Sequence, residues 1–477
     1  MGLSFTSLEF IVFLAVSVGL LHASGKLSVR TWLLAIFSYL FYLSFGIDGV
    51  LVVTVAALAD FAVGQRLGKT ASEVARKRWL WVGLAANLAP LIFFKYSEFL
   101  AGIILGVAQP FGLRVAIPHS VFPIIGLSYF TFAGISYILD VYWETIEPAR
   151  SLGEFLCYLV YFPKLIAGPI VRAADFLPQL SQGFKITVQD FEIACGYLLV
   201  GAVKKLVIAD QLASHVSTIM AAPQSYNAAT LVQGIIGYTV QIYADFSGYS
   251  DMAIGCARLM GIKFPQNFLM PYSSVNIAEF WRRWHVTMSN WFRDYVFLPL
   301  EFSSRGSRNA NLRATRNILI TMLLCGLWHG PSWNFVLWGG LHGLALAVYQ
   351  VYATLRRRRL QARSGFHPLA LLSRALTLLV VMVGWVFFGT QTLPIAFRYL
   401  WRIMIWSRDG VALGSPYILP LAGLMLLAHL VINKDRDLIE DVASRRAPVR
   451  VLTYASLLLA LACLVPSDAV PFVYGRF

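Results

Sequence analysis

Apolar residues are gathered along the chain in long runs, and short polar or basic stretches separate these runs. A helix of about 20 residues crosses the hydrocarbon core of a bilayer, and many of the runs approach that length. The runs cover residues 5–21, 31–45, 50–63, 79–94, 121–141, 155–170, 193–208, 231–244, 318–330, 333–352, 376–388, 418–432 and 451–465. The pattern predicts an all-α, polytopic integral membrane protein with roughly ten to thirteen membrane helices, some of them re-entrant or interfacial.

Basic residues between the runs predict an orientation, because cytoplasmic loops of membrane proteins carry an excess of Lys and Arg. They gather in four places, with few at the opposite ends of the runs. These residues are Lys26, Arg30, Arg66, Lys69, Arg76, Lys77, Arg78, Arg356, Arg357, Arg358, Arg359, Arg363, Lys434, Arg436, Arg445, Arg446 and Arg450. The rule places these loops in the cytoplasm and both termini outside. Residues 1–21 have no basic start and no small-residue cleavage site, so they are expected to form the first span rather than a cleaved signal.

Composition supports a membrane protein, since 58% of the residues are hydrophobic, 13% are charged and the mean hydropathy is +0.66. The net charge of +15 would suggest nucleic acid as the partner of a soluble protein. Here the basic loops and anionic lipid headgroups account for it, so we expect the lipid bilayer and no nucleic acid as a partner. The five cysteines are scattered singly and are expected to be small buried residues. No metal site is expected.

One segment departs from the succession of apolar runs. Residues 245–309 are rich in Trp, Tyr, Arg and carboxylates, and within them "NIAEFWRRWHVTMSNWFRDYVF" has an amphipathic pattern. On a single helix, one side would carry Trp281, Trp284, His285, Met288 and Trp291. Such a helix either lies in the membrane interface, or lines a water-filled cavity at membrane depth. Both interpretations can hold along one helix.

The stretch "CGLWHGPSWNFVLWGG" places His329 in apolar sequence directly before Gly330 and Pro331. Proline disfavours a continuous helix, so we expect the chain to break just after the histidine. A neutral imidazole at such a break could act as a general base or make a structural hydrogen bond, and the residues alone favour neither. His342 would face away from His329 on one continuous helix, so it is interpreted as a packing or hydrogen-bonding residue. His429, alone in an apolar run, is interpreted in the same way.

Asp245 and Tyr249 lie four residues apart at the end of an apolar run, in "YTVQIYADFSGYSDM". They could cap that helix or hydrogen-bond to each other, and they could equally shape a polar pocket. The sequence contains no G-x-S-x-G, Walker A, H-E-x-x-H or dinucleotide-binding pattern that would indicate another chemistry.

Several longer motifs together resemble the membrane-bound O-acyltransferase family. They are "YFPKLIAGPIVRAADFLPQL", "YTVQIYADFSGYSDMAIG", "FWRRWHVTMSNWFRDYVFLPL" and "GLWHGPSWNFVLWGGLHG", supported by "GISYILDVYWE", "GAVKKLVIADQLA", "VGWVFFG" and "PFVYGRF". The likeness is to a bacterial branch represented by the membrane subunit of alginate O-acetyltransferase. It implies one transmembrane domain over residues 1–477, with N-terminal helices in 1–113, a catalytic core in 118–352 and C-terminal helices in 374–477.

The resemblance also implies a mechanism. His329 matches the catalytic histidine of the family, and His285 matches its second histidine. Family members bring an acyl thioester from the cytoplasm to a hydroxyl acceptor from outside, with no bound cofactor. By this resemblance His285, Asn276 and Arg282 would orient the thioester donor or polarise its carbonyl, and the expected donor is acetyl-CoA. Trp281, Trp284 and Trp328 would shield the donor from water, while Asp245 and Tyr249 would shape the pocket.

The expected acceptor is an extracytoplasmic polysaccharide such as alginate, or an extracytoplasmic acetyltransferase that passes the group on, with the protein in the bacterial inner membrane. Alternatives stay open. The stretch "EFSSRGSRNANLRATRN" is a little more similar to the branch that transfers D-alanine to teichoic acids. A polymer transporter would use buried His and Asp as a proton relay, and a non-catalytic scaffold of an export complex would tolerate loss of His329.

Overall fold

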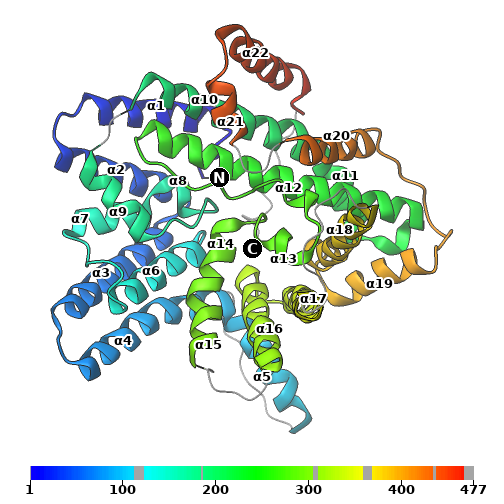
Figure 1. Cartoon of the computed structure of the whole chain (residues 1–477), viewed down its shortest axis with the longest axis horizontal. Coiled ribbons are helices and arrows are strands. Elements are labelled where there is room, and N and C mark those ends of the chain that lie inside the picture. The colour runs from blue at the N-terminus through cyan, green and yellow to red at the C-terminus, as the bar shows by residue number, and fades with distance from the viewer. Residues whose placement is uncertain are drawn as a thin grey trace. The chain divides into compact units, whose positions relative to one another are not determined.

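The computed structural model describes residues 2–111, 123–183, 186–303, 310–357, 368–432 and 437–466. Over these ranges the regular structure is helical, with one isolated bridge between Tyr226 and Val411 and no β-strand (Figure 1). The prediction of an all-α protein is therefore confirmed. The chain forms two compact units, unit 1 (Met1–Leu198 and Tyr249–Pro265) and unit 2 (Leu199–Gly248 and Gln266–Phe477). The expected single domain over residues 1–477 stays a prediction.

Unit 1 is built around three packed helices, α3 (Ile47–Lys69), α4 (Glu73–Leu91) and α6 (Leu127–Tyr142). A buried polar pair joins the first two, since Asn87 donates to Asp60 at 2.6 Å. Gly134 of α6 makes room for that pair, because a Cβ there would lie within 2.3 Å of oxygens of both side chains. The other elements of unit 1 are α1 (Leu8–Ala23), α2 (Leu27–Leu43), η1 (Ile92–Tyr96), α5 (Ser97–Ala108), η2 (Gln109–Phe111), α7 (Leu152–Val160), α8 (Phe162–Leu165) and α9 (Ala173–Gln182), with most of α10 (Val188–Ala202).

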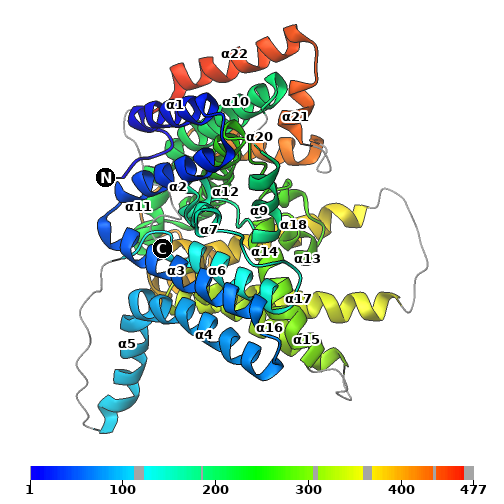
Figure 2. The ribbon, with the colours of Figure 1, turned by 90° about the vertical axis from the view of Figure 1, so that its left-hand side faces the viewer.

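Unit 2 is organised by a hairpin of α16 (Ala310–His329) and α17 (Trp333–Arg357), which lie side by side (Figure 2). The two backbones meet at Gly326 and Gly339, whose Cα atoms leave no space for a side chain. A Cβ on Gly326 would lie 2.2 Å from the carbonyl oxygen of Phe335, and one on Gly339 would lie 2.2 Å from that of Met322. Next to α17 packs α18 (Pro368–Gly389), followed by α19 (Leu393–Met404).

Most of the remaining elements of unit 2 are shorter than α16, α17 and α18. The exception is the long helix α12 (Ala228–Leu259), which the division between the units crosses. The shorter elements are η3 (Val203–Ala209), α11 (Asp210–Ala221), η4 (Pro223–Ser225), η5 (Pro271–Ser273), α13 (Ile277–Trp281), α14 (Val286–Phe292), η6 (Arg293–Phe297), α15 (Leu298–Ser303), α20 (Ile418–Val431), α21 (Leu438–Ala443) and α22 (Ala447–Leu464).

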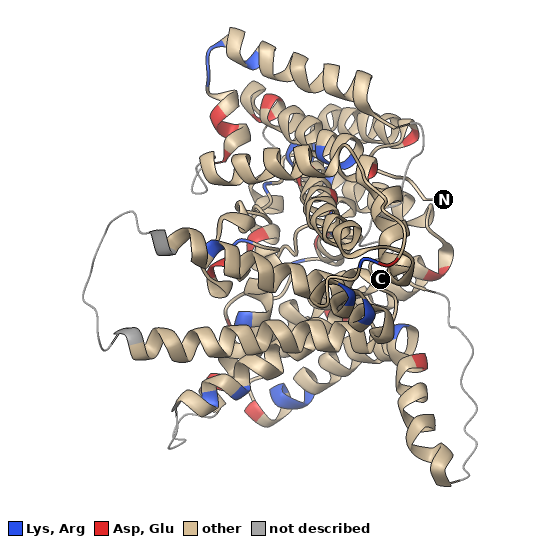
Figure 3. Ribbon diagram, turned by 90° about the vertical axis from the view of Figure 1, so that its right-hand side faces the viewer, with Lys and Arg blue, Asp and Glu red and all other residues tan. Residues whose placement is uncertain are grey.

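Five helical stretches in the described part of the chain are long and apolar enough to cross a membrane. They are Ile47–Lys69, Glu73–Phe111, Trp333–Leu355, Ala370–Gly389 and Ala447–Leu464, and shorter apolar helices cover Leu8–Ala23, Leu27–Leu43 and Ile418–Val431. Figure 3 shows mostly uncharged ribbons, with basic and acidic positions confined to short patches. These features fit the predicted membrane protein, because lipid-facing helix surfaces are apolar.

Some expected spans are not single helices. The run 155–170 is divided, since α7 ends at Val160 and the four-residue α8 begins after Tyr161 with Pro163 in its first turn. Proline lacks the backbone donor that would continue α7, so the helix restarts there instead. The run 193–208 changes from α10 into the π-helix η3. Two parts of the predicted basic loops, residues 358–367 and 433–436, lie outside the described residues, and the predicted orientation stays a prediction. The motif "PFVYGRF" at residues 471–477 also lies outside them.

Candidate functional site

The tryptophan-rich segment is not the single amphipathic helix that its pattern predicts. Helix α13 ends at Trp281, a turn follows over Arg282–His285, and α14 begins at Val286. His285 stands at the N-cap of α14 with φ 44° and ψ 54°, the left-handed conformation that few non-glycine residues adopt. The break changes which side chains share a face. The prediction that Trp281, Trp284, His285, Met288 and Trp291 line one side of a single helix is therefore wrong.

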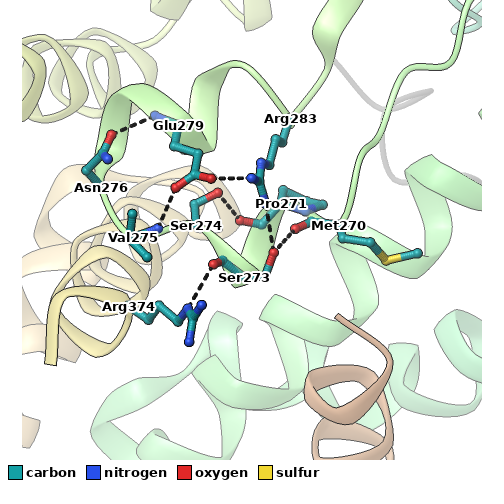
Figure 4. Close-up of polar contacts among 9 residues, drawn as sticks. All are labelled: Met270, Pro271, Ser273, Ser274, Val275, Asn276, Glu279, Arg283 and Arg374. Carbon is teal, nitrogen blue, oxygen red and sulfur yellow. Dashed lines mark hydrogen bonds and ion pairs between the residues drawn. The ribbon is translucent and has the colours of Figure 1, made fainter. Parts of the chain in front are cut away.

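Hydrogen bonds to the helix termini explain the start of α13. Asn276 is its N-cap, and its side-chain oxygen accepts from the backbone N–H of Glu279 at 2.8 Å. Glu279 reaches back and accepts from the N–H of Val275 at 2.8 Å, which completes a reciprocal cap (Figure 4). The side chain of Asn276 thus starts a helix, and its expected role in orienting the thioester stays a prediction.

The carboxylate of Glu279 also forms an ion pair with Arg283. Arg283 donates to the hydroxyl of Ser273 at 2.9 Å, and Arg374 of α18 donates to the Ser273 carbonyl at 3.2 Å. We call Ser273, Asn276, Glu279, Arg283 and Arg374 the capping network (Figure 4). Its charges and donors are matched to each other, so it stabilises the turn before α14. Arg282, which was expected to contact the donor, is exposed on that turn.

A second clamp comes from Asn267, which is distant in sequence from α14. Its carbonyl accepts from the N–H of Val286 at 2.9 Å, and its side-chain oxygen accepts from the hydroxyl of Thr287 at 2.9 Å. The carbonyl of Arg283 accepts from the N–H of Leu269 at 2.9 Å. These contacts satisfy backbone groups that a helix start leaves open, and they hold His285 in its left-handed conformation.

The ring of His285 is fully buried. It stacks on Phe246 of α12, with ring centroids 4.7 Å apart and 28° between the planes, and lies 6.1 Å from the ring of Trp328. Neither ring nitrogen has a hydrogen-bond partner among the described residues. A buried imidazole without such partners is unfavourable unless another molecule supplies them.

His329 is the last residue of α16, so the break predicted at Gly330 and Pro331 is confirmed. The side chain is buried, with 4% of its surface exposed. Its ring centroid lies 4.9 Å from those of Trp328 and Trp338 and 5.1 Å from that of Phe388. It lies at the C-terminal end of α16, where the helix dipole is negative.

The hairpin is fixed to α18 close to this histidine. Asn334, in the first turn of α17, donates to the carbonyl of Thr390 at 2.8 Å and to that of Phe387 at 3.1 Å. This places the end of α18, which carries Trp385 and Phe388, against the break after His329. The contact satisfies carbonyls that a helix end leaves open.

His342 joins the same group of rings. The sequence interpretation placed it away from His329 on one continuous helix, but α16 and α17 are antiparallel and the premise is wrong. The ring of Trp338 lies 4.9 Å from His329 and 5.0 Å from His342. We call His285, His329, His342, Trp328 and Trp338 the histidine cluster.

Two other predicted tryptophans are buried beside the histidine cluster. Trp281 packs edge-on against Trp338 and His342, at 5.6 and 5.2 Å. Trp284 packs against Trp385 at 4.9 Å and Phe268 at 5.0 Å. Trp338, Trp385 and Phe388 were not singled out from the sequence, although "VGWVFFG" was among the motifs.

The remaining two predicted residues have other surroundings. Asp245 lies 2.8 Å from the ammonium of buried Lys205, which also contacts Asp210 at 2.7 Å. This ion cluster joins the "KKLVIAD" and "ADFSG" motifs. Asp245 lies inside α12 (Ala228–Leu259), so the interpretation that it caps a helix end is wrong. Tyr249 belongs to unit 1, where its ring stacks on that of Phe5 at 4.7 Å.

Unit 2 thus holds a buried histidine site in a helical membrane protein, and comparison with known proteins defines its class. A model of the MBOAT, membrane-bound O-acyltransferase, family matches residues 149–391. That range contains every residue of the histidine cluster. The chain belongs to the membrane-bound O-acyltransferase family. It is a membrane O-acyltransferase, and an acyl donor is its co-substrate.

Three relatives show the range of this similarity. The probable alginate O-acetylase of Pseudomonas aeruginosa is 37% identical over 88% of this chain and 79% of its own length. The peptidoglycan O-acetyltransferase of Helicobacter pylori is 31% identical over 80% of this chain and 74% of its own length. The teichoic acid D-alanyltransferase of Streptococcus thermophilus is 30% identical over 53% of this chain and 63% of its own length.

Proposed function

We propose that this protein transfers an acetyl group from a cytoplasmic thioester, acetyl-CoA or a related donor, to a hydroxyl of an extracytoplasmic polysaccharide such as alginate. Transfer would proceed directly or through an extracytoplasmic acetyltransferase. The proposal includes a place in the bacterial inner membrane with both termini outside. Similarity to an alginate O-acetylase over 88% of the chain supports the acetyl group and a polysaccharide acceptor.

His329 acts as the general base in this proposal. Its ring accepts the proton of the acceptor hydroxyl, and the oxygen attacks the thioester carbonyl. The carbon–sulfur bond then breaks, and the thiolate takes the proton from the imidazolium. The observation that carries this role is the placement of His329 at the buried C-terminus of α16, which stabilises the imidazolium that forms.

His285 would stabilise the negative charge that develops on the thioester oxygen. Its ring is held by the stack on Phe246 and by the left-handed turn, and both nitrogens are available to another molecule. A hydrogen-bond donor that is already in position and shielded from water stabilises the oxyanion of acyl transfer effectively. Burial of His329 among Trp328, Trp338 and Phe388 would also exclude water from the thioester.

The test combines a deletion strain with plasmid-borne variants. Mass spectrometry of the surface polysaccharide should show loss of O-acetyl groups in the deletion strain and recovery with the wild-type chain. The His329→Ala variant should insert into the membrane like the wild-type chain but should not restore acetylation, because loss of a general base lowers rates about 10²–10⁴-fold. An unchanged acetyl content in the deletion strain would contradict the proposal.

D-alanyl transfer is the second candidate, supported by the teichoic acid relative at 30% identity over about half of this chain. The same experiment separates the two, because a D-alanyl ester and an acetyl ester differ in mass. A polymer that loses D-alanine in the deletion strain would favour the second candidate and leave the role of His329 unchanged.

A further inference from the structure

Unit 1 contains a small pocket where the first turns of α2 and α7 meet, and this pocket shares no residue with the histidine cluster. All the residues that line it belong to unit 1, and its volume is about 180 Å³. Sites for drug-sized ligands occupy roughly 300–1,000 Å³, so this pocket fits a smaller group. The lining residues that matter for its chemistry are Leu27, Ser28, Trp32, Ser151 and Glu154.

A carboxylate and an indole ring stand next to each other in this pocket. The hydroxyl of Ser151 accepts from the backbone N–H of Glu154 at 3.2 Å, which fixes the first turn of α7 and leaves the carboxylate out of the cap. Glu154 forms no ion pair within the described ranges, and no basic residue is among those that line the pocket. The ring of Trp32 covers Gly153, the neighbour of Glu154, because a Cβ there would lie 3.0 Å from two of the ring carbons.

This pair of groups selects the charge of the ligand. A carboxylate attracts a cation, and the face of an indole ring attracts an ammonium through its quadrupole. A phosphate or another anion in the same place would be repelled by Glu154. A divalent metal ion needs several oxygen ligands, and the described part of the chain has no cluster of three acidic, cysteine or histidine side chains that would supply them. The pocket therefore suits a compact organic ammonium group.

The exposed face of α2 indicates where such a group comes from. Trp32, Ile36 and Leu40 follow one another at intervals of four residues, and 50%, 49% and 50% of their surfaces are exposed. This apolar stripe runs away from the pocket along a helix that has Lys26 at its N-cap and Arg30 in its first turn. Basic residues at the end of an apolar helix lie at the level of the lipid headgroups. The pocket thus lies at that level, with an apolar path beside it.

We propose that Glu154 and Trp32 bind the ammonium headgroup of a phospholipid, as in phosphatidylethanolamine. The ammonium donates to the carboxylate of Glu154 and contacts the ring of Trp32. The hydroxyls of Ser28 and Ser151 are the groups of the pocket that donate to the phosphate. An acyl chain of the lipid follows the stripe of α2. This site shares no residue with the acyl transfer proposed above, so either proposal can fail without the other.

The experiment titrates purified full-length protein in detergent with lipid and measures the bound fraction by native mass spectrometry. Phosphatidylethanolamine is compared with its N-acetyl derivative, which keeps the phosphate and the acyl chains but has no positive charge. We expect an apparent Kd about tenfold lower for phosphatidylethanolamine, as is typical of one hydrogen bond to a charged group. Glu154→Gln should abolish this difference. Trp32→Leu, which keeps an apolar side chain, should raise the Kd for phosphatidylethanolamine about threefold.

Two matched control variants lie elsewhere in unit 1. Trp81→Leu removes a tryptophan of α4 that is 62% exposed, and Glu98→Gln removes an exposed carboxylate in the first turn of α5. Both should bind the two lipids like the wild-type chain. Glu154→Gln should keep the melting temperature within a few degrees, since the cap by Ser151 uses the backbone of residue 154 and not its side chain.

Three results would overturn the inference. Equal binding of the two lipids by the wild-type chain would show that no ammonium is recognised, and this comparison needs no variant to fold. An unchanged preference in Glu154→Gln would place the bound headgroup elsewhere. Competition by soluble O-phosphoethanolamine at the same affinity as the lipid would show that the acyl chains contribute nothing, and the ligand would then be a soluble amine.

Discussion

The capping network and the histidine cluster lie next to each other in unit 2 and treat buried polar groups in opposite ways. In the network, Glu279 serves the N–H of Val275 and the guanidinium of Arg283, and Ser273 bonds to two arginines. In the cluster, His285 and His342 bury ring nitrogens with no partner in the described part of the chain. Matched groups are typical of structural roles and unmatched ones of ligand sites, so the two regions predict different responses to mutation.

The largest effect is expected where a matched charge is removed. Arg283→Glu would place two carboxylates together and leave the partly buried Glu279 without its cation, which destabilises by up to about 3–5 kcal/mol. We expect the abundance of folded protein and its acetylation activity to fall in parallel. Quantitative immunoblotting of membranes, with activity per molecule, checks this. Normal abundance with lost activity would move Arg283 from the network to the site.

Next in size is a change that removes nitrogens but keeps a ring. His285→Phe retains the stack on Phe246 and the volume of the side chain. If His285 stabilises the developing oxyanion, kcat should fall about 10²–10³-fold while the melting temperature stays within a few degrees. The measurement is thermal unfolding in detergent alongside steady-state kinetics. A normal kcat would assign His285 to packing and weaken the comparison between the two regions.

The smallest effect is expected at Arg282, because this residue is exposed on the turn that follows α13. Arg282→Glu should change stability by less than about 0.5 kcal/mol, because exposed substitutions have little to disrupt. If this charge meets an anionic donor at the surface, the KM for acetyl-CoA should rise about threefold, and added salt should reduce the difference. A KM that salt and the substitution both leave unchanged would remove Arg282 from the donor site.

Local sequence was sufficient for some features and not for others. The apolar runs predict the helical membrane protein, and Gly330 with Pro331 predicts the end of α16, because both depend on neighbouring residues. The break before His285 depends on Asn267, which accepts from Val286 and Thr287 across the fold. A helical pattern cannot contain that contact, so the segment was predicted as one helix.

The position of His342 shows the same limit. Its angle relative to His329 was derived for a continuous helix, although the predicted break already ruled out that helix. Once the chain turns at residues 330–332, the close approach of Gly326 and Gly339 brings α17 back along α16. Trp338 then contacts both histidines. The Trp338–His342 spacing of four residues was a signal for a shared helical face that the sequence interpretation did not use.

The proposed acyl transfer requires His329 to act as a base rather than as a structural histidine. His329→Gln tests this most directly, since glutamine can donate and accept hydrogen bonds but cannot take a proton near neutral pH. In purified protein with normal thermal stability, we predict that thiol release from acetyl-CoA in the presence of the acceptor falls about 10²–10⁴-fold, as in His329→Ala. Thiol release and polysaccharide acetylation at wild-type rates in His329→Gln would contradict the account.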